Sequence, residues 1–297
     1  MATYHCHMRT SRALLISLVF LATTLASGCA PKSDSITYQL SLTSNTSEAE
    51  SGKDATVTTT VSAQDGGNVN TFVGVQAQDP SGSWVTWSEP IKFALPATQD
   101  FHGTWLAGDT NYRVALWSSK PASNEAPPVT SSPIKVTGWD YRAVYDKFTA
   151  AETKALSGWP TYYQEQAKCL SLPNRRGNLA TFQSCFAKYD VAFKNVVALN
   201  SEYITFLNTF EVPPSITDEF RAYRNTVAIA DTRLASMYEV FCTDEPHSTL
   251  DWYNCVGSSD VSESWDKYYV IQDDIIPTRS DLAYAFVDHG LPNFTNQ

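Results

Sequence analysis

Between Ile36 and Thr137, hydrophobic and polar residues alternate along short runs, which is the period of β-strands. The runs are rich in valine, threonine and aromatic residues, and clusters of Gly, Pro, Asn, Asp and Ser separate them. They are ITYQLSL, ATVTTTVSA, TFVGVQAQ, WVTW, IKFAL, YRVALW and PIKVTG. Such a series within about 100 residues predicts an all-β sandwich over residues 36–137.

From Trp139 onward the hydrophobic residues recur with the period of α-helices. The longest apolar stripe lies in the run 178–210, and a later run opens with Ser215 and Asp218 in a weak form of the capping pattern. Further short helices are expected at Leu250–Cys255, Glu263–Ile271 and Arg279–Val287. Because short turns join these runs, residues 138–297 are predicted to form an all-α up-and-down helical bundle.

The stretch LAGDTNYRVALW, residues 106–117, resembles the approach to the sixth strand of immunoglobulin-like and fibronectin type III domains. In those domains a corner tyrosine directs its hydroxyl to the loop backbone, and the resemblance implies this role for Tyr112. Val114 and Leu116 would then follow it inward. The Pro-rich stretch PASNEAPPVTSSP is interpreted as the loop before the last strand. The domain boundary therefore falls at Thr137–Gly138, with almost no linker.

The first 28 residues have the pattern of a secretory signal peptide. Arg9 and Arg12 precede Ala13–Ala26, an uncharged and mostly apolar run of 14 residues. As a helix this run is about 21 Å long, shorter than a hydrocarbon core of roughly 30 Å. A spanning helix is therefore disfavoured. Met8 offers a second start from which the charged segment and the apolar run are still complete.

The residues that end this segment, Leu25-Ala26-Ser27-Gly28-Cys29, resemble the lipobox of bacterial lipoproteins. In that family the cysteine thiol receives a diacylglyceryl group, and the peptide is cut just before it. The resemblance implies that residues 1–28 are removed, that Cys29 is lipidated and that residues 29–35 form a short tether. Ala26 stands where the family most often has Leu. The alternative is a soluble secreted protein in which Cys29 is an incidental thiol.

Residues 29–297 carry 19 basic and 31 acidic side chains, a net charge of −12. This balance argues against nucleic acid and against an anionic membrane surface as partners. Four cysteines follow Cys29, and an even number in an exported chain predicts two disulfides. Local pairing, Cys169 with Cys185 and Cys242 with Cys255, is favoured because each pair flanks a helix end and the next helix start, although four cysteines allow three pairings.

Motifs of known catalytic centres are absent from the sequence, including G-x-S-x-G, H-E-x-x-H, the Walker loop and G-x-G-x-x-G. The histidines after residue 28 are His102, His247 and His289, which are widely spaced. The adjacent acidic pairs Asp218-Glu219 and Asp273-Asp274 are interpreted as solvated faces, because neighbouring helical residues point in different directions. No catalytic residue, cofactor or metal is therefore expected.

The tryptophans are the residues that suggest a binding surface. Trp84 and Trp87 lie three positions apart on a presumed strand and so face opposite sides of the sheet. Trp117 faces outward if Tyr112 faces inward. Trp87 and Trp117 are accordingly the candidate ligand platform, able to stack on sugar rings or to dock a partner. The alternative is that the outward indoles seal a contact with the helical half.

These patterns favour a non-enzymatic, extracytoplasmic protein of the bacterial cell envelope, anchored to the membrane by the lipid on Cys29. Its binding partner would be an envelope protein or glycan of unknown identity. The alternative is a polysaccharide-binding or polysaccharide-hydrolysing lipoprotein. A hydrolase would need a cleft that joins two carboxylates about 5–10 Å apart.

Overall fold

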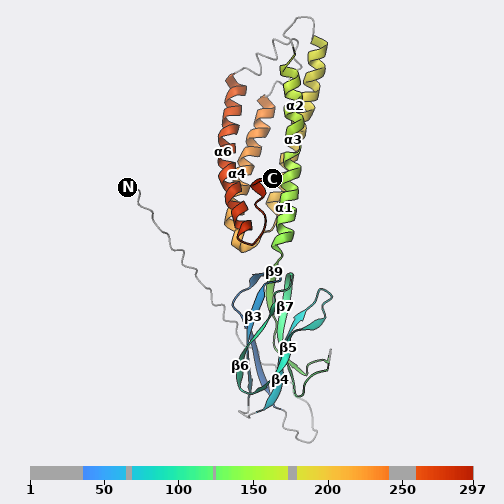
Figure 1. The fold of residues 1–297 in the computed structure, drawn as a ribbon, viewed down its shortest axis with the longest axis vertical. Coiled ribbons are helices and arrows are strands. Elements are labelled where there is room, and N and C mark those ends of the chain that lie inside the picture. The colour runs from blue at the N-terminus through green and yellow to red at the C-terminus, as the bar shows by residue number, and fades with distance from the viewer. Residues whose placement is uncertain (1–35, 65–68, 123–124, 173–178, 241–258, 297) are drawn as a thin grey trace, which may run out of the picture.

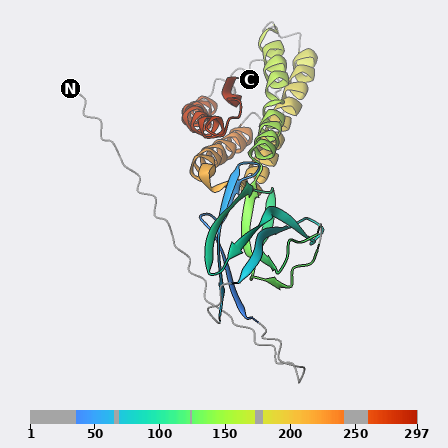
Figure 2. The same cartoon turned by 60° about the horizontal axis from the view of Figure 1, so that its bottom comes forward.

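A computed structural model of the chain describes residues 36–296, apart from 65–68, 123–124, 173–178 and 241–258. The predicted signal peptide, tether and lipidated Cys29 lie outside the described residues, as do Cys242 and Cys255. A β-sandwich-like region of two sheets is followed by a helical region, and the two lie end to end (Figure 1). Figure 2, turned by 60°, shows the same arrangement.

The β-region contains a three-stranded and a six-stranded sheet. The first has the order β1 (Tyr38–Ser44), β3 (Asp54–Ala63), β6 (Ala97–Thr104). The second has the order β2 (Glu48–Glu50), β9 (Ile134–Trp139), β7 (Gly108–Trp117), β4 (Asn70–Gln78), β5 (Trp84–Ala94), and β8 (Val129–Thr130) pairs with β7. Neighbouring strands are antiparallel except β2 and β9, which are parallel.

The core of the β-region contains the inward residues of both sheets. Val57 on β3 and Val114 on β7 are fully buried, as the alternating pattern predicts. Tyr112 is also fully buried, and its hydroxyl accepts a hydrogen bond from the Leu106 backbone N–H at 3.2 Å. This is the contact that the resemblance of residues 106–117 implies for Tyr112.

Some details of the strands differ from the sequence prediction. The runs WVTW and IKFAL form one strand, β5, because Glu89 and Pro90 between them are accommodated in an irregularity opposite Gly74. The strands β2, β6 and β8 were not predicted, and β8 lies within the Pro-rich stretch interpreted above as a loop. The sequence of β6, ATQDFHGT, is mostly polar, and Phe101 is its one residue that is fully buried in the core.

The helical region contains α1 (Tyr141–Leu156), α2 (Trp159–Leu170), α3 (Leu179–Thr209), α4 (Thr217–Val240) and α6 (Ser259–Val287), with the short 3-10 helices η1 (Pro214–Ile216) and η2 (Phe294–Asn296). The Asp140 side chain caps α1 by accepting from the Ala143 N–H at 3.0 Å. Helix α3 packs along α1, α2 and α4, and α4 packs along α6. No described helix is long and apolar enough to span a membrane.

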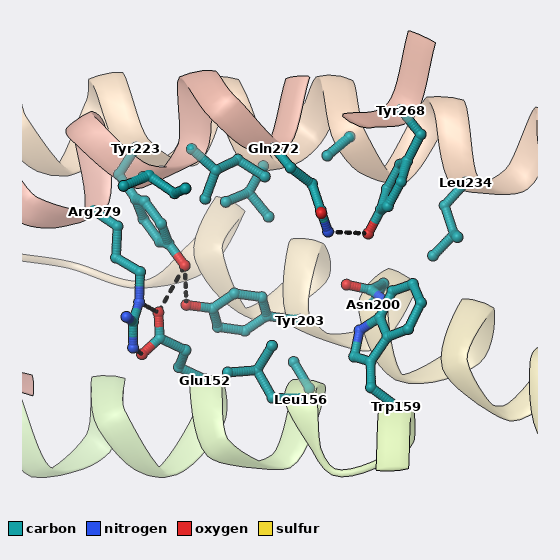
Figure 3. Close-up of a pocket in the computed structure, with 15 residues that line it drawn as sticks. Glu152, Leu156, Trp159, Asn200, Tyr203, Tyr223, Leu234, Tyr268, Gln272 and Arg279 are labelled. Atoms are coloured by element: carbon teal, nitrogen blue, oxygen red, sulfur yellow. Dashed lines mark hydrogen bonds and ion pairs between the residues drawn. The ribbon is translucent and has the colours of Figure 1, made fainter. Parts of the chain in front are cut away.

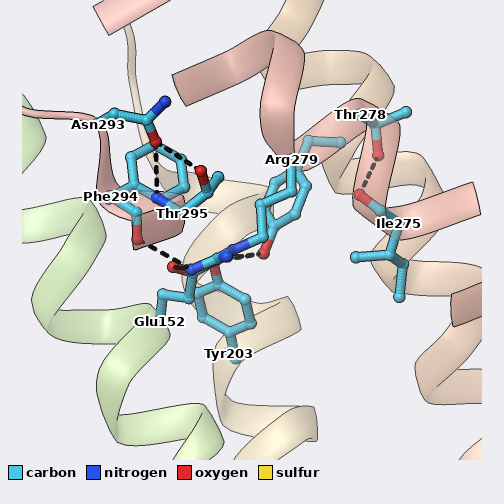
Figure 4. A network of polar contacts seen from close by, with 9 residues as sticks. Glu152, Tyr203, Ile275, Thr278, Arg279, Asn293, Phe294 and Thr295 are labelled. Atoms are coloured by element: carbon cyan, nitrogen blue, oxygen red, sulfur yellow. Dashed lines mark hydrogen bonds and ion pairs between the residues drawn. The ribbon is translucent and has the colours of Figure 1, made fainter. Parts of the chain in front are cut away.

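Helix α6 corrects the prediction of separate helices at Glu263–Ile271 and Arg279–Val287. Both segments belong to one helix that continues through Pro277. Proline removes a backbone N–H from the helical ladder, and the neighbouring Thr278 hydroxyl donates to the Ile275 carbonyl at 3.1 Å (Figure 4). The expected helix at Leu250–Cys255 lies outside the described residues.

The disulfide Cys169–Cys185 joins the end of α2 to the start of α3, which confirms the predicted pairing. Among the described residues of the helical region there are two hydrophobic clusters. The proximal cluster, nearer the sheets, includes Tyr145, Phe148, Phe220, Phe286 and Phe294. The distal cluster includes Tyr162, Tyr189, Phe193, Leu234 and Tyr268.

Only Asp140 separates the end of β9 from the start of α1. The Trp139 indole N–H donates to the Glu48 carboxylate at 2.8 Å, which ties the last strand to β2. From the end of the helical region, His289 lies 3.1 Å from the Glu50 carboxylate and stacks on Tyr141 with ring centroids 3.8 Å apart. The helical and β-regions are therefore in direct contact.

Candidate functional site

A cavity of about 290 Å³ lies inside the helical region between the proximal and distal clusters (Figure 3). Helices α1, α2, α3, α4 and α6 all contribute to its wall. On α1 and α2 the lining residues Glu152, Ala155 and Trp159 follow the helical spacing i, i+3, i+7. On α6, Gln272, Ile275 and Arg279 repeat that spacing, so one face of each segment is turned to the cavity.

One end of the cavity holds a buried ion pair (Figure 3). Arg279 donates from Nε to Glu152 Oε1 and from Nη2 to Oε2, both at 2.8 Å. The Glu152 side chain is 7% exposed and that of Arg279 is 26% exposed. Such paired, parallel hydrogen bonds between a guanidinium and a carboxylate are among the strong polar contacts in proteins. Hydrogen bonding to Glu152 raises the pKa of Arg279, which keeps its positive charge.

Two tyrosines extend this polar group into the cavity wall. The Tyr223 hydroxyl donates to Glu152 Oε1 at 2.9 Å, and the Tyr203 hydroxyl lies 3.2 Å from that of Tyr223. Burial raises the pKa of both phenols. Both therefore remain neutral hydroxyl groups at neutral pH, and their bonds hold the Glu152 carboxylate in place.

The end of the chain packs against the far side of the ion pair (Figure 4). Arg279 Nη2 also donates to the Phe294 carbonyl at 3.4 Å, and the guanidinium lies 5.2 Å from the centroid of the Phe294 ring. The Asn293 side chain accepts from the backbone N–H of Thr295 at 2.9 Å and from its hydroxyl at 2.6 Å, which orders this turn. The guanidinium is thus held from two directions.

The other end of the cavity is aromatic and carries neutral amides (Figure 3). Trp159 and Tyr268 are stacked with ring centroids 6.0 Å apart. Gln272 donates from Nε2 to the Tyr268 hydroxyl at 3.0 Å, and Asn200 donates from Nδ2 to the Val196 carbonyl at 3.0 Å. Burial raises the pKa of Tyr268 to about 12, so this phenol is also neutral.

The rim of the cavity lies between α1 and α6. Leu156 on α1 is 50% exposed and Ile276 on α6 is 66% exposed, although both line the cavity. Deeper in, Ala155, Val227 and Ala230 are buried and apolar. The site is therefore an apolar pocket with one polar end, reached from the gap between these two helices.

The indoles proposed from the sequence as a ligand platform lie in the β-region, where Trp87 is half-buried and Trp117 is buried. Trp87 packs against the core of the β-region beside Trp105 and Tyr112, and its N–H donates to the Thr104 carbonyl at 2.7 Å. Trp117 is only 3% exposed, and its N–H donates to the Glu125 carbonyl at 3.3 Å. The loop that follows β7 covers this indole.

Trp117 also does not seal the contact with the helical half, which was the alternative expectation. It is the last residue of β7, whereas Gly108, the first residue, pairs with Gly138 at the junction. At about 3.4 Å per residue, Trp117 is roughly 30 Å from the junction. Trp84 does face away from Trp87, and the Arg113 guanidinium stacks on it 4.0 Å from the ring centroid.

Sequence reasoning did not select any residue of the cavity. One signal was present: Glu152 occurs at the helical spacing of Tyr145, Phe148 and Ala155, so a carboxylate interrupts an apolar stripe. A charged residue at a core position requires a partner. The partner, Arg279, is 127 positions away in the chain and could not be identified from local pattern.

No protein-family model and no characterised protein sequence matches the chain. Among solved structures, the chain is similar to the native conformation of E. coli alpha-2-macroglobulin, with 9% sequence identity and a TM-score of 0.22. The match covers 87% of this chain and 24% of that one, so the chain spans about a quarter of the length of that protein. A likeness at this TM-score carries no argument about fold or function.

Proposed function

We propose that this protein is a non-enzymatic, lipid-anchored protein of the bacterial cell envelope, and that its helical region binds a small molecule in the cavity between α1 and α6. The observation that carries the binding proposal is the cavity itself, to which all the described α-helices contribute and which is lined mainly by apolar and aromatic side chains. At about 290 Å³ it is near the lower end of the range for small-molecule sites, roughly 300–1,000 Å³.

The β-region is proposed to be an immunoglobulin-like sandwich and the helical region an up-and-down bundle. The first assignment is supported by the strand orders β1-β3-β6 and β2-β9-β7-β4-β5 and by the bond from the Leu106 N–H to the Tyr112 hydroxyl. The second is supported by long helices that pack on their neighbours in the chain. In this arrangement the sandwich is a spacer that holds the binding region away from the membrane.

A binding role fits the chemistry of the cavity better than hydrolysis of a polysaccharide. Glycosidases use two carboxylates that flank the scissile bond. Among the described residues that line the cavity, Glu152 is the one carboxylate, and both of its oxygens accept hydrogen bonds from Arg279. The hydrolase alternative therefore finds no support at this site.

Filling the cavity should abolish binding of a small apolar probe. We expect the full chain, with Cys29→Ser to keep it free of lipid, to bind the fluorescent probe N-phenyl-1-naphthylamine in a saturable manner. Ala155→Leu places three extra carbons in the cavity, so this binding should disappear while the melting temperature does not fall. Ala230→Leu, from the wall on α4, should act in the same way.

The matched control for this experiment is Ala150→Leu, which adds the same atoms to an exposed position of α1 and should leave binding unchanged. If Ala155→Leu and Ala230→Leu both bind the probe as the unsubstituted chain does, the cavity is not the binding site and the proposal fails.

The lipid anchor has its own test. Metabolic labelling with a palmitate analogue should mark the protein, and Cys29→Ser should abolish the label because the thiol is the acceptor in the lipoprotein family. Cys6→Ser, in the segment expected to be removed, is the control and should be labelled normally. Equal labelling of Cys29→Ser and the unsubstituted protein would end the lipoprotein proposal.

A further inference from the structure

We infer that the ligand of the cavity between α1 and α6 is an uncharged molecule with a flat apolar body and at least one hydrogen-bond donor. This inference rests on the proposed function and adds the chemical class of the ligand. Three features of the cavity lead to it: its charges cancel internally, its aromatic end is flat, and its amide oxygens lack donors among the described residues.

The first feature is the balance of charge. Glu152 and Arg279 are the charged residues among the described residues that line the cavity, and they neutralise one another through two hydrogen bonds. The Tyr223 hydroxyl and the Phe294 carbonyl occupy further positions around the pair. A charged ligand would leave water without gaining a free counter-ion, and such burial is strongly unfavourable. The cavity therefore selects against both anions and cations.

The second feature is the shape of the aromatic end. Trp159 and Tyr268 are stacked with an angle of 28° between their rings, and the Tyr203 ring forms part of the wall. Val227, Leu234 and Ile275 supply the aliphatic surface. A ligand with a flat ring can pack against both kinds of wall and gains the contact energy of ring against ring.

The third feature is the pair of amides, which Figure 3 shows at the same end as Trp159. The Asn200 and Gln272 nitrogens donate to Val196 and to Tyr268, respectively. Among the described residues, neither amide oxygen accepts a hydrogen bond. Both side chains are half-buried, so their oxygens are within reach of water, and an N–H or O–H group on the ligand would replace that water as the donor.

Two probes that differ by one sulfonate test this inference. N-phenyl-1-naphthylamine is uncharged and has two flat aromatic groups and one N–H. 1-Anilinonaphthalene-8-sulfonate has the same skeleton and a negative charge. Each is titrated into the full chain with Cys29→Ser and into the same chain with Ala155→Leu, and only the signal that Ala155→Leu removes is counted as cavity binding. We expect the uncharged probe to bind at least tenfold more tightly.

Three variants sharpen the result. Asn200→Leu and Gln272→Leu are made as separate variants. At least one of them should bind the uncharged probe about fivefold more weakly, which is the effect of losing one hydrogen bond. Glu152→Gln keeps the shape of the side chain but leaves Arg279 without its counter-ion. It should therefore raise the affinity for the sulfonate probe at least tenfold, an effect that a merely structural role of Glu152 would not produce.

The outcomes separate the two proposals. If the sulfonate probe binds the cavity as tightly as the uncharged one, or if Glu152→Gln leaves the preference unchanged, the inference about the ligand is overturned while binding in the cavity stands. If both amide variants bind the uncharged probe with full affinity, the hydrogen-bond donor is overturned. If neither probe gives a signal that Ala155→Leu removes, the proposed function fails and the inference fails with it.

Discussion

Replacing Glu152 by alanine is expected to lower the free energy of unfolding by about 3 kcal/mol. The substitution leaves the Arg279 guanidinium without either of its 2.8 Å bonds to the carboxylate, and it removes the acceptor of the Tyr223 hydroxyl. Breaking one side of a buried ion pair costs about 3–5 kcal/mol. The lower end applies here because the Arg279 side chain keeps 26% exposure and can partly rehydrate.

Urea unfolding followed by the far-ultraviolet circular dichroism of the helices measures this loss. The double variant Glu152→Met with Arg279→Met should lose less stability than Glu152→Ala alone, because it leaves no unpaired charge in the cavity wall. Glu202→Ala is the control. It breaks the exposed ion pair between Lys154 on α1 and Glu202 on α3 and should cost only about 0.5 kcal/mol. A similar small loss for Glu152→Ala would show that water already screens the buried pair.

Replacing Gly138 by alanine is expected to destabilise the β-region by about 3 kcal/mol. Gly138 lies on β9 opposite Gly108, and a Cβ atom added there would be 1.8 Å from the Leu106 carbonyl oxygen. That neighbour is backbone, so the 106–107 turn would have to move as a unit. The movement would also disturb the bond between the Leu106 N–H and the Tyr112 hydroxyl, next to the contact between the two regions.

Urea unfolding followed by tryptophan fluorescence measures this second loss. Gly158→Ala is the matched control, because a Cβ atom added there meets side-chain ends, with Leu199 Cδ1 at 3.0 Å and Val196 Cγ2 at 3.1 Å. Gly158 also has right-handed helical dihedrals that alanine adopts readily. Its effect should be within about 1 kcal/mol of zero. Gly138→Ala unfolding at the same urea concentration as Gly158→Ala would contradict the expected clash.

Most of the strands and helices follow from local patterns of the sequence. A strand buried on one side alternates polar and apolar residues, as β3 does, and a helix packed on one side repeats every three or four residues, as α1 does. The hydrophobic pattern did not reveal β6, because few of its side chains are buried. It also did not reveal that α6 is one helix, because a proline such as Pro277 usually ends a helix. The disulfide Cys169–Cys185 was predictable because its partners lie near the adjoining ends of two consecutive helices.

The candidate site was decided by the tertiary structure. Periodicity shows that a residue such as Glu152 or Trp87 is turned toward one face of its element, but it does not show what lies opposite. Glu152 meets Arg279 only because α6 returns beside the start of the helical region. Trp117 is covered because the loop after β7 folds back over it. The sequence by itself determines which faces are buried, since that depends on neighbours along the chain. Which buried faces meet, and whether a cavity remains between them, depends on packing between residues far apart in the chain.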